Sequence, residues 1–515
     1  MLPLSEFAIV MSGMDNVAVA KRDIIQGSIL SHDAVVLTVG EDIRKGHRLA
    51  IEQIPRGTAV VQYGYTFGIS KGIERGGLVS RERVRDWRVD TAGLKALVSS
   101  FEPFVHPGAE RYRSMSFSGF ERVGGRVGTR NYYLVVPASL CASDLAVKLA
   151  GSLDSDERLK REYPAVDGIL CAAHTEGCGC DDGRIIDRYL LTLVNTVAHP
   201  NVGGALIVGL GCEKKSARDF KDIFGRIAKQ KPIDYLSIQA EGGTGRALKK
   251  GRELILARLG EVNSAKREQV PLSSLIVGTE CGASDSFSGI TANPVIGSAV
   301  DAVISAGGSA ILSEVPEMIG AEEAIASRIA SFAVLEKFIG GMAYYRQLAA
   351  WLGVEMEGNF VEANARGGLI NPTLKSLGAV LKGGRSEVVD FLDYSELAVK
   401  KGLSLMNGPG NDLESMTGIA AGGATIMLFS TGSGTTEGCL IAPVIKIPSR
   451  TELFEQMDED MDFDAGRLLS TEATVGELAD ELVELIIQVA SGRKTCSERW
   501  AKRSFQIWTA GKLSL

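Results

Sequence analysis

Reactive side chains gather in one short stretch of the chain, residues 279–294, TECGASDSFSGITANP. The stretch holds a thiol, Cys281, a carboxylate, Asp285, and the hydroxyl groups of Ser284 and Ser288. The apolar run LSSLIVG precedes it and the helix-like run VIGSAVDAVISAGG follows it, so we expect the stretch where a strand ends. Thiols and carboxylates bind metal ions or move protons, and hydroxyls suit the oxygens of a polar substrate.

Four further loops at predicted strand ends carry the same kinds of side chain. They contain Cys141; His174, Glu176, Cys178 and Cys180; Cys212 and Glu213; and Glu314 and Glu317. Ligands of open α/β sheets bind beyond the carboxyl ends of the strands, so these loops are expected to face a functional cleft. Each group alone also has a structural interpretation, since most cysteines are small buried residues and Asp285 suits a helix N-cap.

The spacing of the cysteines argues against a structural zinc site. No C-x2-C pair is present, and Cys178 and Cys180 are too close in sequence to bind one ion without strain. At most one of these two is expected as a ligand. Thiolate ligands would favour iron over Mg²⁺.

Alternating strand and helix patterns must position these loops. From residue 117 to 263 a strand-like run is followed by a helix-like run four times, and a second α/β block begins near residue 271. Residues 1–90 instead show short β-type runs and a recurring D-I-x-x-G turn. We predict an α/β protein with a small β-rich module at 1–90, a linker at 91–116, and two domains with mainly parallel sheets at 117–263 and 270–513.

The composition excludes several classes of protein. The 515 residues carry a net charge of −7 with no block of Lys or Arg, which argues against a nucleic-acid partner or an anionic membrane surface. No run of about 18 apolar residues predicts a membrane span, and the first residues do not resemble a signal peptide. The eight cysteines suit reduced thiols or metal ligands, so we predict a cytoplasmic location.

Several motifs together resemble the altronate/galactarate dehydratase family. They are SGFERVGGRVGTRNYYLVVP, HTEGCG, VGLGCEK, CGASDSFSGITANPVIGSAVDAVISAGGSAILSEVPE, FSTGSGT and APVIKI. The resemblance covers nearly the whole chain. Residues 1–90, with DNVAVA and GHRLAIEQIPRGTAVVQYGYTFGIS, resemble the family's SAF module, and the two later blocks resemble its second and C-terminal domains.

The resemblance implies a hydro-lyase that dehydrates a sugar acid to a 2-keto-3-deoxy acid. A base removes the proton α to the carboxylate, hydroxide leaves from the β carbon, and a metal and amide donors stabilise the enediolate. It implies a divalent metal, Fe²⁺ first, with Mn²⁺ as an alternative. The cysteines at the strand ends leave an iron–sulfur cluster open as a further alternative. We also expect the chain to form a homo-oligomer and to bind a small sugar acid as its substrate.

The site residues expected on this basis fall into three groups. The catalytic group is Asp285, Glu314 and His174; the substrate-binding group is Arg130, Asn131, Ser284, Ser288, Thr291, Asn293 and Asn364; the metal-binding group is Cys141, Cys178, Cys212 and Cys281.

The chain departs from the family pattern at three places. The stretch GGLVSRERV lacks the histidines usual in the SAF module; a Lys is missing beside Asn364, with Arg366 nearby; and Ser433 replaces an Arg. Lys and Arg suit substrate carboxylates, so the loss of both argues against altronate and galactarate themselves as substrates. Two alternatives therefore stay open: a related C–S lyase such as (2R)-sulfolactate sulfo-lyase, and a sugar-acid-binding paralogue without turnover.

Overall fold

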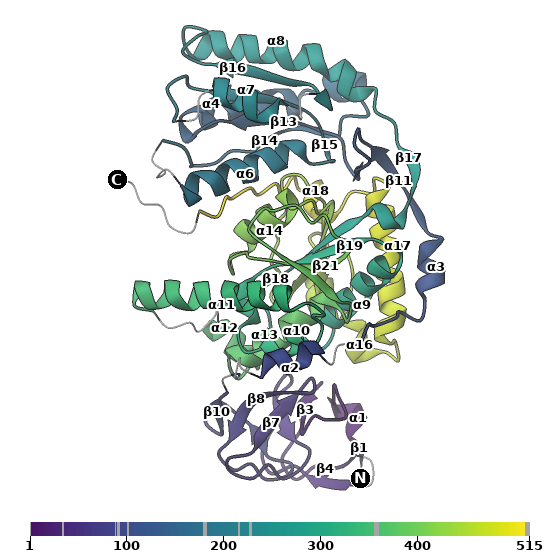
Figure 1. Ribbon diagram of the computed structural model, residues 1–515. Coiled ribbons are helices and arrows are strands. Elements are labelled where there is room, and N and C mark those ends of the chain that lie inside the picture. The colour runs from purple at the N-terminus through teal and green to yellow at the C-terminus, as the bar shows by residue number, and fades with distance from the viewer. Residues whose placement is uncertain are drawn as a thin grey trace.

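The computed structural model stacks three units along one axis (Figure 1). It describes residues 2–32, 35–87, 89, 93–99, 102–178, 183–214, 217–225, 229–354 and 360–509. The N-terminal unit lies at one end, a unit built from residues 132–263 lies at the other, and the C-terminal unit lies between them. The predicted α/β class with a β-rich N-terminal module and mostly parallel later sheets is confirmed.

The N-terminal unit is a set of small sheets joined by glycine turns. Its recurring turn places Gly27, Gly46, Gly57 and Gly76 at φ between 78° and 88°, a conformation that other residues adopt only with strain. Its sheets have the strand orders β1-β4-β5, β10-β8-β7 and β2-β3-β6-β9. The elements are β1 (Leu2–Pro3), α1 (Leu4–Phe7), β2 (Ala8–Ile9), β3 (Val17–Ala20), β4 (Ile29–His32), β5 (Val35–Thr38), β6 (Arg48–Ala50), β7 (Ala59–Gln62), β8 (Tyr65–Ser70), β9 (Leu78–Val79) and β10 (Val84–Asp86).

The second unit is a four-stranded parallel sheet in the order β14-β13-β15-β16. Apolar side chains of α4 and α8 pack on one face of the sheet, and those of α6 pack on the other. The face covered by α6 continues into the core of the C-terminal unit, so α6 lies between two sheets. The elements are β13 (Tyr132–Pro137), α4 (Leu140–Asp154), α5 (Glu157–Glu162), β14 (Gly168–Cys171), α6 (Arg184–Ala198), β15 (Val202–Gly209), α7 (Ala217–Phe224), β16 (Ile233–Ser237) and α8 (Thr244–Asn263).

The C-terminal unit holds a six-stranded parallel sheet in the order β20-β21-β19-β18-β22-β23. Helices α9 and α17 pack against each other on one side, and α14 contacts α6 of the second unit on the other. Strand β20 has no counterpart among the strands expected from the sequence. The strands are β18 (Ile276–Gly282), β19 (Ser309–Leu312), β20 (Val388–Leu392), β21 (Gly402–Met406), β22 (Ile426–Thr431) and β23 (Val444–Pro448).

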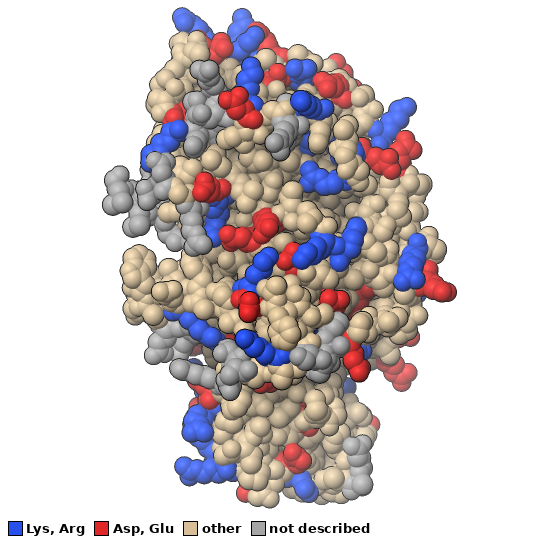
Figure 2. Space-filling view, in the orientation of Figure 1, with Lys and Arg blue, Asp and Glu red and all other residues tan. Residues whose placement is uncertain are grey.

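Helices connect these strands, many of them one or two turns long. They are η2 (Leu272–Ser274), α9 (Ala292–Ser305), η3 (Val315–Met318), α10 (Glu322–Ala326), α11 (Phe332–Leu352), α12 (Glu362–Arg366), α13 (Pro372–Ala379), η4 (Val380–Gly383), α14 (Asp412–Ala421), α15 (Thr451–Gln456), α16 (Arg467–Ser470), α17 (Val475–Ala490) and α18 (Cys496–Arg499). None of the helices within the described ranges has the length and apolar character that crossing a membrane requires. Lys and Arg are interspersed with Asp and Glu on the face in Figure 2.

The segment predicted as a linker contains two short helices, α2 (Leu94–Ser99) and α3 (Ala109–Arg113). It leads into a small antiparallel sheet of β11 (Ser116–Glu121), β12 (Val127–Gly128) and β17 (Glu268–Pro271). Because β11 precedes the second unit and β17 follows it, this sheet closes the base of that unit.

The N-terminal unit is joined to the C-terminal unit by a buried arginine. Arg48 is fully buried, and its guanidinium donates to the Ser286 hydroxyl at 2.7 Å and to the Gly368 carbonyl. Residues of the two units also belong to one apolar core, in which Phe67 and Leu374 are both fully buried. The module therefore braces the loop that starts at Cys281.

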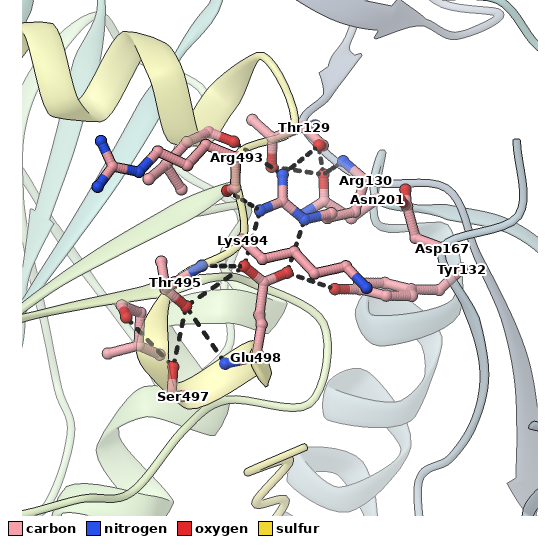
Figure 3. Close-up of polar contacts among 12 residues, drawn as sticks. Thr129, Arg130, Tyr132, Asp167, Asn201, Arg493, Lys494, Thr495, Ser497 and Glu498 are labelled. Atoms are coloured by element: carbon pink, nitrogen blue, oxygen red, sulfur yellow. Dashed lines mark hydrogen bonds and ion pairs between the residues drawn. The ribbon is translucent and has the colours of Figure 1, made fainter. Parts of the chain in front are cut away.

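A buried ion pair joins the other two units (Figure 3). The Arg130 guanidinium makes two bonds to the Glu498 carboxylate, at 2.6 and 2.7 Å, and Tyr132 donates to the same carboxylate at 3.1 Å. The remaining N–H groups of Arg130 donate to main-chain carbonyls, which include those of Val489 and Arg493. Arg130 begins the second unit and Glu498 lies in α18, so the pair fixes how the two units meet.

Replacing Glu498 with Gln is expected to lower the free energy of unfolding by about 3–5 kcal/mol. A buried guanidinium left without its counter-charge keeps its full desolvation cost. Chemical denaturation of the variant measures the effect. Glu481→Gln, which breaks an exposed pair with Arg467, is the control and is expected to change stability far less. Equal, small effects in both variants would contradict the interpretation.

Candidate functional site

Buried charged groups meet at the carboxyl end of β18, an interior strand of the six-stranded sheet. Glu280 and Cys281 end this strand, and Glu314 and Glu317 follow the neighbouring strand β19. The two strands pair in parallel, with Thr279 opposite Leu312, so their ends reach the same edge of the sheet. Lysines from α13 and η4 complete the group. We call Glu280, Cys281, Glu314, Glu317, Lys375, Lys382 and Asp412 the acid–lysine cluster.

Two ion pairs organise the acid–lysine cluster. Lys382 Nζ lies 2.8 Å from Glu314 Oε2, and Lys375 Nζ lies 2.8 Å from Glu317 Oε1. None of the four side chains is more than 6% exposed. The Cys281 thiol lies between the two acids, 3.8 Å from Glu314 and 3.6 Å from Glu317. Buried ammonium and carboxylate groups need such pairing, because each alone would carry a large desolvation cost.

Two carboxylate oxygens of the cluster have no hydrogen-bond partner. Glu280 accepts a 2.6 Å bond from Ser415 on Oε2, but its Oε1 atom, like Oε1 of Glu314, is buried and unpaired. Glu314 has a positive φ of 69°, which costs backbone energy in a residue other than glycine and directs its side chain into the cluster. Glu280, Glu314 and Asp412 each place one oxygen within 4.8 Å of the others.

Burial dominates the electrostatics of the cluster. It raises the pKa of the Cys281 thiol well above its usual value, so this group stays a thiol at neutral pH. Burial, then the charges of Glu314 and Glu317, raise the pKa of Asp412 to about 7. Burial lowers the pKa of Lys446 to about 7; its ammonium lies over the Phe429 ring at 3.3 Å, with no hydrogen-bond partner.

The cluster opens into a pocket of about 350 Å³. Its charged lining comes from Glu317, Lys375, Asp412 and Glu437, and Cys281 lies at its floor beside Gly282. A side chain at position 282 would collide with the Asp412 carboxylate, so the glycine there lets the loop approach the acid. Pockets of this size accept small polar metabolites.

Asp285 lies outside the acid–lysine cluster and binds the loop around it. Its Oδ1 atom accepts from the main chain of Phe287 and from both Ser288 donors, at 2.9–3.1 Å. Its Oδ2 atom accepts from Ser449 at 3.0 Å and from Arg450 at 3.1 Å. Burial raises the pKa of Asp285, and Arg450 opposes that effect. The expected helix cap is therefore not found: Oδ1 closes the turn at 285–288, and the N-cap of α9 is Thr291.

The polar residues predicted to touch substrate hold the walls of the site through internal bonds. Asn364 lines the pocket and donates to the Ser284 carbonyl at 2.7 Å, which ties two loops together. Thr291 donates to the Ser449 carbonyl at 2.7 Å, and Asn293 donates to the Gly378 carbonyl at 2.9 Å. Direct contact of these groups with substrate remains a prediction.

The other predicted residues lie in the second unit. Arg130 forms the ion pair of Figure 3, and Asn131 donates to the Ala165 and Val262 carbonyls, so the contacts of both are with the protein itself. His174 is buried and packs edge-to-face against Tyr189. Cys141, in the first turn of α4, and Cys178 and Cys212, on loops, are exposed in the second unit, apart from the buried Cys281. Cys180 lies outside the described residues.

Sequence reasoning missed five charged residues of this region: Glu280, Lys375, Lys382, Asp412 and Lys446. A signal was present for the lysines. Lys375 and Lys382 lie seven residues apart in the otherwise apolar TLKSLGAVLKGG, two helical turns on one face, and Lys446 interrupts the apolar strand VIKIP. A lysine inside a buried run requires a counter-charge. Their acidic partners could not be chosen without the fold.

Comparisons with known proteins give matches to three family models along the chain. D-galactarate/altronate dehydratase, C-terminal, matches residues 272–513; D-galactarate dehydratase/altronate hydrolase, second domain, matches 119–263; and the altronate/galactarate dehydratase SAF domain matches 6–86. The altronate dehydratase of Bacillus subtilis is 34% identical, covering 96% of this chain and 97% of its own. The galactarate dehydratase (L-threo-forming) of Escherichia coli is 30% identical, covering 96% of this chain and 95% of its own. The (2R)-sulfolactate sulfo-lyase subunit beta of Chromohalobacter salexigens is 29% identical, covering 77% of this chain and 97% of its own.

Asp285→Asn is expected to lower the free energy of unfolding by about 1–3 kcal/mol. The new amide turns an N–H₂ group towards donors, so Arg450 or Ser288 loses its acceptor inside the protein. Thermal unfolding beside the exposed Asp458→Asn control measures this. An unchanged melting temperature would leave Asp285 free for a purely chemical role.

Proposed function

From the membership of this chain in the D-galactarate/altronate dehydratase family, we propose that it removes water from an aldonic acid in the pocket beside Cys281. The chain is a sugar-acid hydro-lyase, because altronate and galactarate dehydratases match it over nearly its whole length. We further propose where the reaction takes place, which substrate it uses and what individual residues do.

The observation that supports this location is the pairing of Lys375 with Glu317 on the wall of the pocket. The reaction breaks the C–H bond α to the substrate carboxylate and the C–O bond at the β carbon, which yields water and an enol. Negative charge builds on the carboxylate as the α proton leaves. An ammonium group held at that point by a buried carboxylate stabilises this charge without reorganising.

Asp412 has the properties of a proton carrier for this reaction when no cation is bound to its carboxylate. It lines the same pocket as Lys375, and a pKa of about 7 lets it both accept and release a proton near neutral pH. We assign it the α proton or the proton that the departing hydroxyl needs. Glu314, predicted as a catalytic acid, lies one layer deeper, where it holds Lys382.

The charges of the pocket favour a monocarboxylate substrate. Lys375 is its single cation among the described lining residues, whereas Glu317, Asp412 and Glu437 are acidic. Arg366, the nearest substitute for the missing family lysine, has a 74% exposed side chain that approaches Glu362 at 3.8 Å. The acids of this pocket would therefore repel the second carboxylate of an aldarate. They would not repel the uncharged terminal hydroxymethyl group of an aldonate.

We expect kcat/KM for altronate to exceed kcat/KM for galactarate by at least about tenfold. We expect Lys375→Met to lower kcat/KM for altronate by about 10²–10³-fold, because the substrate carboxylate loses its cation. Release of 2-keto acid measures both. Lys400→Met, at an exposed ion pair, is the matched control and should retain full activity. A preference for galactarate would contradict the charge argument. Sulfite release from (2R)-sulfolactate with no keto acid from sugar acids would favour the sulfo-lyase alternative, and turnover of neither would favour a binding paralogue.

The acid–lysine cluster also fits a divalent cation. Glu280, Glu314 and Asp412 offer three carboxylate oxygens within 4.8 Å, and the unpaired oxygens of Glu280 and Glu314 lack the donor or cation that buried carboxylates require. Oxygen ligands suit Mn²⁺ and Fe²⁺ as well as Mg²⁺. We propose Fe²⁺ or Mn²⁺, which would supply Lewis acidity beside the substrate carboxylate.

Glu280→Gln is expected to lower the affinity for Mn²⁺ by about 10–100-fold, because it replaces one of the three carboxyl groups with an amide that cannot give up a proton to bind the cation. Equilibrium dialysis of the chelator-treated protein measures binding without any assay of turnover. Glu253→Gln, at an exposed site on α8 of the second unit, serves as the control. Unchanged binding in Glu280→Gln would place the cation elsewhere.

A cytoplasmic location and a homo-oligomeric state remain proposals. The first is supported by the absence of disulfides among the seven cysteines that the structure describes.

A further inference from the structure

Three exposed cysteines remain that the pocket beside Cys281 does not use. Cys141, Cys178 and Cys212 each follow a different strand of the second unit, β13, β14 and β15. These strands are neighbours in the order β14-β13-β15, and all three run parallel. Their carboxyl ends therefore meet at one edge of the sheet, with Cys141 on the middle strand.

The register of the sheet places Cys141 and Cys212 the same number of residues beyond a paired position. Pro137 on β13 pairs with Val208 on β15, and the Ala138 N–H donates to the Val208 carbonyl at 2.7 Å. Cys141 lies four residues beyond Pro137 (137 to 141), and Cys212 lies four residues beyond Val208 (208 to 212). Neighbouring strands are about 4.8 Å apart, so the two loops leave the sheet side by side.

Main-chain contacts bring the third cysteine to the same place. The loop after β14 runs along the first turn of α4: the Leu140 N–H donates to the Glu176 carbonyl at 2.7 Å, and the Ser143 hydroxyl donates to the His174 carbonyl at 2.7 Å. Gly177 approaches Ser139 so closely that an added Cβ would lie 2.7 Å from the serine Cβ. Cys178 follows directly, next to the helix turn that carries Cys141.

Each loop is shaped to present its thiol. Cys178 follows Gly177 at φ 141°, and Cys212 follows Gly211 at φ 123°, conformations that glycine adopts without strain. The Glu213 carboxylate accepts from the N–H groups of Leu210 and Gly211, which folds the loop back under Cys212. Cys141 lies in the first turn of the 15-residue helix α4, and its side chain is exposed there.

We propose that Cys141, Cys178 and Cys212 together ligate an iron–sulfur cluster at this edge of the sheet. A single tetrahedral ion would need its sulfur ligands within about 4 Å of one another, since metal–sulfur bonds are about 2.3 Å long. Within the described ranges, no group of three metal-binding atoms closer than 4.8 Å includes these thiols. A cluster holds its cysteines farther apart, because several irons and inorganic sulfides lie between them. Binding would release the three thiol protons and leave one iron of a four-iron cluster without a protein thiolate.

This site adjoins the pocket beside Cys281. A cavity of about 890 Å³ between the second and C-terminal units is lined by residues that include His174, Glu176 and Leu413, and Leu413 also lines the pocket with Asp412. The cluster is a second centre, distinct from the carboxylate group that fits Mn²⁺ or Fe²⁺. Its relation to catalysis rests on the proposed function, but its existence does not.

The test is reconstitution of the full chain with equal amounts of Fe²⁺ and Fe³⁺ and with sulfide, without oxygen, followed by assay of bound iron, acid-labile sulfide and visible absorption. We expect about four irons and four sulfides per chain with a broad band near 400 nm, and loss of most of both elements in Cys141→Ser, Cys178→Ser and Cys212→Ser. Cys171→Ala, on the same sheet, and Cys281→Ala are the controls and should retain the cluster. Thermal unfolding of each variant shows that the thiol change, at an exposed position, leaves the fold intact.

Three results would overturn the proposal: no iron and sulfide in the wild-type chain, iron bound without sulfide, or full cluster content in any of the three serine variants. A disulfide between Cys141 and Cys178 in the anaerobically purified protein would do so as well. None of these readouts uses turnover, so a wrong substrate assignment cannot imitate them. Inactive protein with an intact cluster would contradict the proposed function alone.

Discussion

The buried pairs Lys382–Glu314 and Lys375–Glu317 are the interactions on which the site depends. Four charges of opposite sign lie at the end of one strand, and none could remain there alone, since an unpaired buried charge costs several kcal/mol. Each pair joins the end of β19 to a segment more than fifty residues later in the chain. The ends of β18 and β19, α13 and η4 are therefore fixed together, and Cys281 is enclosed between them.

The same constraint explains the arrangement of the three units. Each unit reaches its neighbour through a buried guanidinium, Arg48 at one boundary and Arg130 at the other, and each guanidinium ends on polar groups of the C-terminal unit. Arginine suits this task because its planar N–H groups satisfy several acceptors at once. The N-terminal module consequently braces the loop of Ser286 and the second unit meets α18 in one orientation, which keeps the cavity between the units open.

The two candidate metal centres differ in chemistry as well as in place. Oxygen atoms of Glu280, Glu314 and Asp412 form a hard, buried set, whereas the three loop cysteines form a soft and exposed one. The cysteines looked like a single set with Cys281 when only their positions after strands were known. The fold divides them because β18 belongs to a different sheet from β13, β14 and β15.

The sequence by itself determined the class of fold, most of the strands and helices, and the loops that carry the chemistry. Those features depend on local patterns: apolar runs make buried parallel strands, and glycines with reactive neighbours mark where the strands end. It could not determine which loops meet. The sequence shows Lys375 and Lys382 as lysines in an apolar helix, but it does not show which acids pair with them. Those pairings depend on contacts between distant segments, as do the unpaired oxygen of Glu280 and the ion pair of Arg130 with Glu498. Asp285 was seen as a cap or a base, and only the packed loop supplied Ser449 and Arg450 as partners for its second oxygen. Strand order and register, set by how whole sheets bury their faces, decided all of these pairings.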